Sequence, residues 1–165
     1  MAILHTISTI WQILETVPDP EVPVLSVIDL GIVRDVQLHD NKVEITITPT
    51  YSGCPAMDMI SMNIRLALLE KGYKEIEIKT ILSPAWTTDW MTEKGKEKLK
   101  AYGIAPPNVK QAVCTPEAFA SQEAIQCPRC NSYHTTLISQ FGSTACKALY
   151  QCNDCHEPFD YFKCH

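Results

Sequence analysis

The sequence predicts an α+β fold: a small three-stranded sheet with helices, followed by a C-terminal zinc ribbon. Apolar and polar residues alternate over 43–48 and over 76–80, as they do in half-buried strands. Two Cys-x-x-Cys pairs lie in roughly the last forty residues, where metal ligands can replace a large core. We therefore expect an α+β domain at 1–105, a linker at 106–126 and a zinc ribbon at 127–165.

The first element is a short amphipathic helix. Ser8 is a residue type that caps helix N-termini, so we expect the helix to begin there. Apolar residues follow at helical spacing: Ile10, Ile13, Leu14 and Val17. Pro18 lacks an amide donor and disfavours helix in the residue before it, so the helix should end at about Val17.

A β-hairpin comes next. We expect strands at 32–38 and 43–48, joined by the turn residues His39, Asp40 and Asn41. The third strand, around 76–80, follows a buried helix at 55–71 that is rich in Ala, Met, Leu and Ile. Gly72 suits the position just after that helix.

The last helix of this domain is expected over 87–102, with Gly103 closing it. The order is then helix, strand, strand, helix, strand, helix. This order predicts a small α+β domain with a three-stranded mixed sheet.

Composition and charge restrict the function. Apolar residues make up 45% of the chain, which is enough for a hydrophobic core. The net charge is −5, which argues against nucleic acid or an anionic membrane as the partner. We find neither a run of about 20 apolar residues nor a secretory signal, so we expect a cytoplasmic protein with reduced cysteines.

The metal module rests on Cys127, Cys130, Cys152 and Cys155. Each Cys-x-x-Cys pair can form a knuckle with both sulfurs facing one ion, and two knuckles complete a tetrahedron of thiolates that suits zinc. Four protein ligands leave no open position for substrate, which favours a structural role. The alternative is a redox or iron–sulfur site.

Other soft ligands in the ribbon remain unassigned: Cys146, Cys164, His134, His156 and His165. Cys164 and His165 could supply a second soft site. The simpler interpretation is that these are free thiols and surface histidines in a reducing compartment.

Cys54 is the candidate functional thiol. It lies between a strand and the buried helix, and Pro55 suits the first helical position, so we expect Cys54 to be the N-cap. The free helical amides and the helix dipole should then lower its pKa and favour the thiolate. A reactive or metal-ligating thiolate and a buried apolar cap are equally supported by the residues alone. Motifs for dinucleotide, nucleotide phosphate, metalloprotease or di-iron sites are missing from the sequence.

Two runs carry a resemblance. Asp19-Pro20-Glu21-Val22-Pro23-Val24, with Asp29-Leu30-Gly31-Ile32-Val33, resembles the family of small domains linked to iron–sulfur cluster assembly and cytosolic metal–sulfur maturation. That family has a cysteine in the loop before its main helix, and Cys54 matches it. This resemblance covers about residues 5–85.

A second resemblance is carried by two runs in the ribbon, Gly142-Ser-Thr-Ala-Cys-Lys-Ala-Leu-Tyr150 and Glu157-Pro-Phe-Asp-Tyr-Phe-Lys-Cys-His165. With these runs, the whole chain is similar to the PaaD family, proteins associated with the phenylacetyl-CoA ring epoxidase of aerobic phenylacetate catabolism. It implies a bacterial cytoplasmic protein that works with a multicomponent monooxygenase. A di-iron subunit of that system epoxidises the ring, and a separate reductase supplies electrons.

Three functions follow from the resemblance. The first is a maturation factor, not catalytic alone, in which Cys54 transiently binds iron or an iron–sulfur cluster and the zinc-stabilised ribbon docks the client. The second is a structural subunit of the oxygenase without metal transfer. The third is an enzyme with Cys54 as its nucleophile. The implied partners are the other epoxidase subunits, oxygenase or reductase, and a homodimer is left open.

Overall fold

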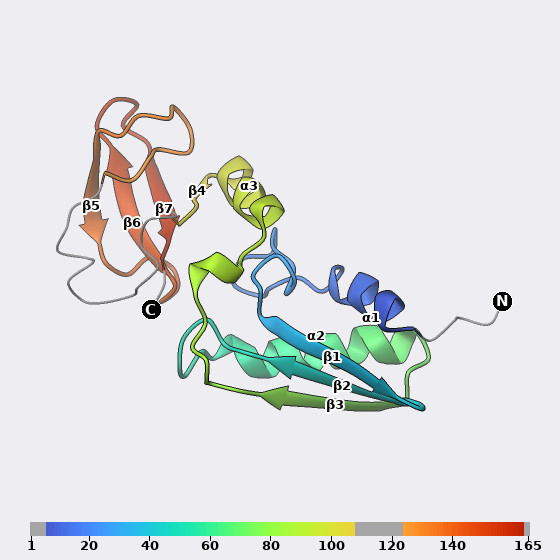
Figure 1. Cartoon of the computed structure of the whole chain (residues 1–165). Coiled ribbons are helices and arrows are strands. Elements are labelled where there is room, and N and C mark those ends of the chain that lie inside the picture. Colours follow the sequence, from blue (N-terminus) through green and yellow to red (C-terminus); the bar gives the residue numbers. More distant parts are fainter. Residues whose placement is uncertain (1–5, 108–123, 164–165) are drawn as a thin grey trace. The chain divides into compact units, whose positions relative to one another are not determined.

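The computed structural model describes residues 6–107 and 124–163, and the chain divides into two units, Met1–Trp86 and Thr87–His165 (Figure 1). The first unit holds α1 (Ile7–Leu14), β1 (Val33–His39), β2 (Lys42–Ile47), α2 (Ala56–Glu70) and β3 (Glu75–Thr80). The second holds a 3₁₀ turn (Thr88–Trp90), α3 (Glu93–Tyr102), β4 (Ile104–Ala105), β5 (Thr135–Ser139), β6 (Lys147–Cys152) and β7 (Pro158–Phe162).

The sheet of the first unit has the strand order β1-β2-β3. The β1–β2 pair is antiparallel and the β2–β3 pair is parallel, so the mixed three-stranded sheet is confirmed. Its inner face is built by Val43, Ile45 and Ile47, which are fully buried. The opposite face is polar and carries ion pairs such as Lys79 with Glu44, at 2.6 Å.

Helix α2 lies along the inner face of the sheet, and α1 contacts both α2 and β1 (Figure 1). Four residues of α2 face this core: Ala56, Ile60, Ile64 and Leu68. Gly72 follows the helix with a φ of 91°, a left-handed conformation that favours glycine and turns the chain toward β3. The Arg65 Nη1 donates to the Ile76 carbonyl oxygen at 2.8 Å and so ties α2 to β3.

Two helix boundaries differ from expectation. Helix α1 is capped by Thr6, whose hydroxyl accepts from the Thr9 N–H at 3.2 Å, so Ser8 lies inside the helix. The region 87–102 does not form one helix, because Met91 is extended and Thr92 caps a new one. The Thr92 hydroxyl accepts from the Gly95 N–H at 2.9 Å, and Gly103, with φ 91°, ends α3 as expected.

The second unit is a four-stranded sheet of order β4-β7-β6-β5. Its strands are antiparallel except that β4 pairs in parallel with β7. This pairing assigns α3 and β4 to the ribbon unit, so the units divide after Trp86, whereas the sequence suggested a division at 105. Ile125, from the expected linker, is buried in the ribbon core, and residues 108–123 of that linker lie outside the described part of the chain.

The ribbon core is small. It consists of Ala105, Ile125, Cys127, Ala148, Cys152, Phe159 and Tyr161. Tyr150 packs against it, stacked on Phe159 and edge-on to Tyr161, with ring centroids 5.9 and 5.8 Å away. None of the helices in the described ranges has the length and apolar character needed to cross a bilayer.

Candidate functional site

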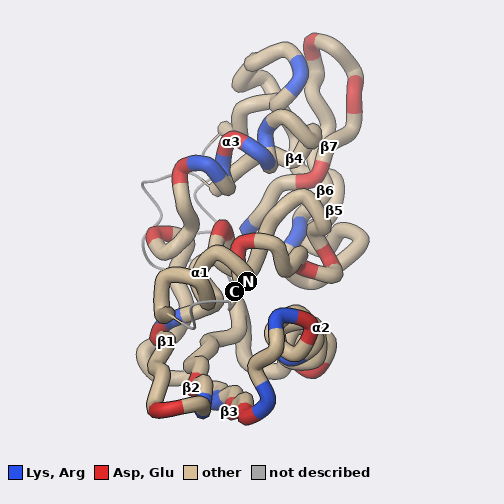
Figure 2. The backbone as a smooth tube through the Cα atoms, turned by 90° about the vertical axis from the view of Figure 1, so that its right-hand side faces the viewer, with Lys and Arg blue, Asp and Glu red and all other residues tan. Residues whose placement is uncertain are grey.

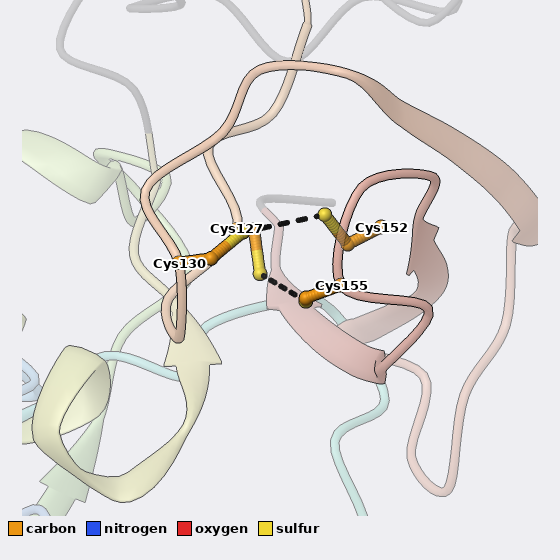
Figure 3. Close-up of side chains that lie close together, drawn as sticks. All are labelled: Cys127, Cys130, Cys152 and Cys155. Atoms are coloured by element: carbon orange, nitrogen blue, oxygen red, sulfur yellow. Dashed lines mark hydrogen bonds between the residues drawn. The ribbon is translucent and has the colours of Figure 1, made fainter.

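The four ribbon cysteines converge on one point. Cys127 and Cys130 come from the segment before β5, whereas Cys152 ends β6 and Cys155 lies in the turn between β6 and β7. All four Sγ atoms lie within 4.8 Å of one another, with Cys130 and Cys152 3.5 Å apart and Cys127 and Cys155 3.8 Å apart (Figure 3). A tetrahedral site with Zn–S bonds of about 2.3 Å has its sulfurs about 3.8 Å apart, so these residues fit one such ion.

The two knuckles are built alike. The N–H of Cys127 donates to the Ser132 carbonyl at 2.8 Å, and the N–H of Cys152 donates to the Glu157 carbonyl at 3.0 Å. Each knuckle then has a left-handed residue just after its second cysteine: Asn131, with φ 62°, and His156, with φ 60°. The backbone reverses there and presents both sulfurs of a pair to the same side.

Backbone amides near the four cysteines stabilise negative charge on their sulfurs. The N–H of Cys155 donates to the Cys152 sulfur, and with help from the Asp154 N–H it lowers the pKa of Cys152 to about 7. At Cys130 the Ser132 N–H also lowers the thiol pKa, but the neighbouring sulfurs and burial outweigh it and raise the pKa to about 12. Four thiols this close do not all lose their protons unaided, whereas a bound cation replaces those protons.

A polar cluster joins the two knuckles beside the cysteines. Asp154 accepts hydrogen bonds from the Ser132 hydroxyl and, at 3.0 Å, pairs with the His134 Nδ1. The Ser132 contact, followed by that of His134, lowers the pKa of the Asp154 carboxyl. His134 therefore has a structural partner.

Cys146 lies apart from the four-cysteine group. It is buried, with its sulfur 3.0 Å from the Thr144 hydroxyl. Cys164 and His165, expected as a second soft site, lie outside the described residues.

Cys54 is half-buried in the loop between β2 and α2. Its expected N-cap position is wrong, because Pro55 is the N-cap and Ala56 is the first helical residue. Gly53 has a φ of 86°, so the sharp turn expected before the cysteine is present. The Ala56 N–H still donates to the Cys54 sulfur.

The expected low pKa of Cys54 is also wrong. Burial is the main reason that the thiol pKa is raised, and the negative charges of Glu21 and Asp19 act in the same direction. The hydrogen bonds from Ala56 and from the Tyr51 side chain lower the pKa by less. One helical amide is therefore too little to overcome desolvation and two nearby carboxylates.

Asp19 and Glu21 thus belong to the surroundings of Cys54, a role that sequence reasoning missed. Asp19 is only 5% exposed, and its Oδ1 accepts from the N–H groups of Glu21 and Val22 at 2.9 and 2.7 Å. An Asp between prolines in a tight turn was the available signal. The Thr48 hydroxyl, at the start of the Cys54 loop, is buried and has no hydrogen-bond partner among the described residues.

Among residues 6–107 and 124–163, only the ribbon cysteines form a group of three or more His, Cys, Asp or Glu side chains with their ligand atoms this close. Cys54 with Asp19 and Glu21 does not meet that distance. The ribbon site is therefore assembled by the fold, whereas the Cys54 loop offers one thiol near two carboxylates.

Two family models match separate parts of the chain. Residues 7–79 match the family model of an iron–sulfur cluster assembly protein, and residues 111–163 match the model of the PaaD zinc beta ribbon domain.

An Escherichia coli (strain K12) protein, named as the putative D component of 1,2-phenylacetyl-CoA epoxidase, is 52% identical over 94% of this chain and 91% of its own length. A Porphyromonas gingivalis protein named Fe-S protein maturation auxiliary factor is 38% identical over 58% of this chain and 92% of its own length. A crystal structure of a domain of unknown function, DUF59, from Bacillus anthracis matches with a TM-score of 0.53 and 30% identity, over 56% of this chain and 89% of that one.

Proposed function

This chain belongs to the PaaD family of phenylacetyl-CoA epoxidase components, and from that premise we propose that it assists the assembly of an iron–sulfur or di-iron centre in the epoxidase. One observation carries the proposal. A protein named for Fe–S maturation is matched along 92% of its length by 58% of this chain. The chain therefore has the parts of a maturation factor and, in addition, a zinc ribbon.

The chemistry of the Cys54 loop supports transient binding of a cation. Burial, followed by the charges of Glu21 and Asp19, raises the pKa of the Cys54 thiol, so the thiol keeps its proton at neutral pH. The same negative charge of Asp19 and Glu21 attracts iron, and an arriving cation displaces the thiol proton. The thiolate then exists while the metal is bound, and the thiol takes up a proton again when the metal leaves.

We assign the ribbon a structural zinc held by Cys127, Cys130, Cys152 and Cys155. Its surface supports a docking role for the ribbon, because Tyr133 and Phe141 are about 60% exposed. The clients are then the oxygenase or the reductase subunits, in the cytoplasm, where thiols stay reduced.

A structural subunit without metal transfer is the second candidate. The name of the Escherichia coli relative, a component of the epoxidase, favours it. The two candidates differ in stoichiometry, because a maturation factor leaves its client and a structural subunit co-purifies with it.

The test is to express the epoxidase genes with and without this gene and to measure iron and acid-labile sulfide in each purified partner. We expect one partner to lose its metal centre when this chain is absent, and the active complex to lack this chain. Fully loaded partners, together with stoichiometric co-purification, would support the structural-subunit function instead.

Two variants of the Cys54 loop test whether its thiol handles the metal. Cys54→Ser should give the same metal-poor partner as the deletion, whereas Ser52→Ala, in the same loop, should restore full loading. Full loading with Cys54→Ser at normal protein levels would contradict metal handling by this thiol.

A further inference from the structure

The outer face of α2 carries a row of large apolar side chains that the core does not use. Met59, Met62, Leu66 and Leu69 are 51, 58, 51 and 45% exposed. Single exposed apolar residues are ordinary on a protein surface, but four in one row on one helix are characteristic of an interaction face. Figure 2 looks nearly along α2 and shows charged residues of both signs on the same helix.

The spacing of the row indicates what kind of surface it fits. The four residues are separated by three, four and three positions, which is the a/d pattern of a two-helix seam. In such a seam, two residues of every seven contact the partner, and the partner is one other helix. A broad groove or a sheet would need a wider apolar face.

Charged residues on both flanks of this apolar row indicate which helix can pack against it. Arg65 lies on one flank, directly before Leu66, and Glu70 lies on the other, directly after Leu69. In a parallel pair of helices, a residue on the first flank faces the residue five positions later on the second flank of the other helix. Two parallel copies of α2 therefore bring Arg65 of each copy to Glu70 of the other.

The remaining flanking residues are compatible with the same arrangement. Asp58 would face Asn63, which is uncharged and can donate to it. An antiparallel pair on the same seam would instead bring the two Arg65 side chains together. Arg65 already uses Nη1 on the Ile76 carbonyl, but a guanidinium has five donors, so it can bind a carboxylate as well.

We propose that two copies of this chain associate through α2, packed in parallel along Met59, Met62, Leu66 and Leu69. This inference does not depend on the proposed function. The seam has only four side chains per copy, well below a standard interface, so the dimer forms reversibly at micromolar or higher concentration. Because α2 directly follows the Cys54 loop, a parallel pair places both loops at the same end of the interface.

The test is sedimentation velocity of the full chain from about 1 to 200 μM, a range that covers micromolar dissociation constants. We expect a monomer–dimer equilibrium in the wild type. Leu66→Glu should weaken it at least about tenfold, because it buries a charge in the seam. Leu82→Glu is the matched control: Leu82 is 62% exposed and lies outside α2, so the dimer should persist. Unchanged circular dichroism would show that both variants are folded.

Orientation is tested by charge exchange. Arg65→Glu and Glu70→Arg should each weaken the dimer, and the double variant should restore it. A chain that stays monomeric at every concentration, or a dimer that Leu66→Glu leaves intact, would overturn the proposal. Failure of the double variant to restore association would overturn the parallel arrangement.

Discussion

The two units of this chain are stabilised in different ways. Among the described residues, ten of the twelve largest fully buried side chains lie in the first unit, and only Leu99 and Phe162 lie in the second. The ribbon has a core of seven residues, and two of those belong to the four-cysteine group. The first unit therefore folds by burying apolar surface, whereas we expect the ribbon to depend on a metal ion held by its four cysteines.

Cysteine side chains have different roles in the two units. Cys127 and Cys152 are fully buried and form part of a core, whereas Cys54 is half-buried in the loop between β2 and α2. We therefore expect the same substitution to unfold the ribbon and to leave the first unit folded.

Cys152→Ser should have the largest effect. It removes a metal ligand, and because metal binding supplies the folding free energy of such modules, residues 124–163 should lose their structure. Hydrogen exchange followed by mass spectrometry should show full exchange in ribbon peptides, with protection kept in residues 6–86. Cys146→Ser, also buried but outside the four-cysteine group, should retain both metal and protection. Protected ribbon peptides in a metal-free variant would contradict this dependence.

Ile64→Ala should destabilise the first unit and leave the ribbon unchanged. Ile64 is fully buried between α2 and the sheet, so its truncation should cost about 2–5 kcal/mol of the first unit's unfolding free energy. Urea unfolding should show the loss, while elemental analysis should show the same metal content as the wild type. Leu82→Ala, at an exposed position, should change the free energy by less than about 0.5 kcal/mol.

Cys54→Ser should change stability by less than about 1 kcal/mol, because serine can still accept the Ala56 N–H. A thermal unfolding curve that matches the wild type would support this expectation. Its effect should be compared with that of Cys152→Ser, which makes the same chemical change in the ribbon. A large loss of stability in Cys54→Ser would mean that the loop is part of the core after all.

The smallest effect concerns the titration of Cys54. Burial, followed by the charges of Glu21 and Asp19, raises the pKa of the Cys54 thiol above its ordinary value, so the thiolate is scarce at neutral pH. Alkylation at Cys54 should therefore be slower at pH 7 than that of a free cysteine, and its rate should keep rising with pH beyond the point at which the rate for a free cysteine levels off. Asp19→Asn removes one of the two charges and should shift the rate profile to lower pH. Rapid alkylation at pH 7 would contradict the raised pKa.

Local patterns were sufficient for much of the fold. The alternation of Val43, Ile45 and Ile47 predicted a strand with one buried face, and the order of the elements predicted a mixed three-stranded sheet. Likewise, the spacing of the four cysteines predicted the group that the structure brings together. These features depend on residues close in sequence or on one strong chemical preference.

The errors arose where distant residues decide the outcome. Ile104 and Ala105 pair with Asp160 and Tyr161, and nothing local in a two-residue strand shows that it belongs to the ribbon. The pKa of the Cys54 thiol is raised by burial and also by Glu21 and Asp19, which lie more than thirty positions earlier. From the local sequence we expected the helix N-terminus to lower the pKa of Cys54. The carboxylates and the burial that raise this pKa cannot be read from the residues next to Cys54.

The pairing of β4 with β7 also sets the order in which the chain can fold during its synthesis. The first unit is complete once Trp86 has left the ribosome, but β4 has no partner strand until Asp160 and Tyr161 appear, about 75 residues later. At roughly 5–20 residues per second, this delay lasts several seconds. Cys127 and Cys130 wait less long for the second knuckle, because Cys152 and Cys155 each follow 25 residues later, after roughly 1–5 s. Until then the newborn ribbon has only two of its four cysteine ligands.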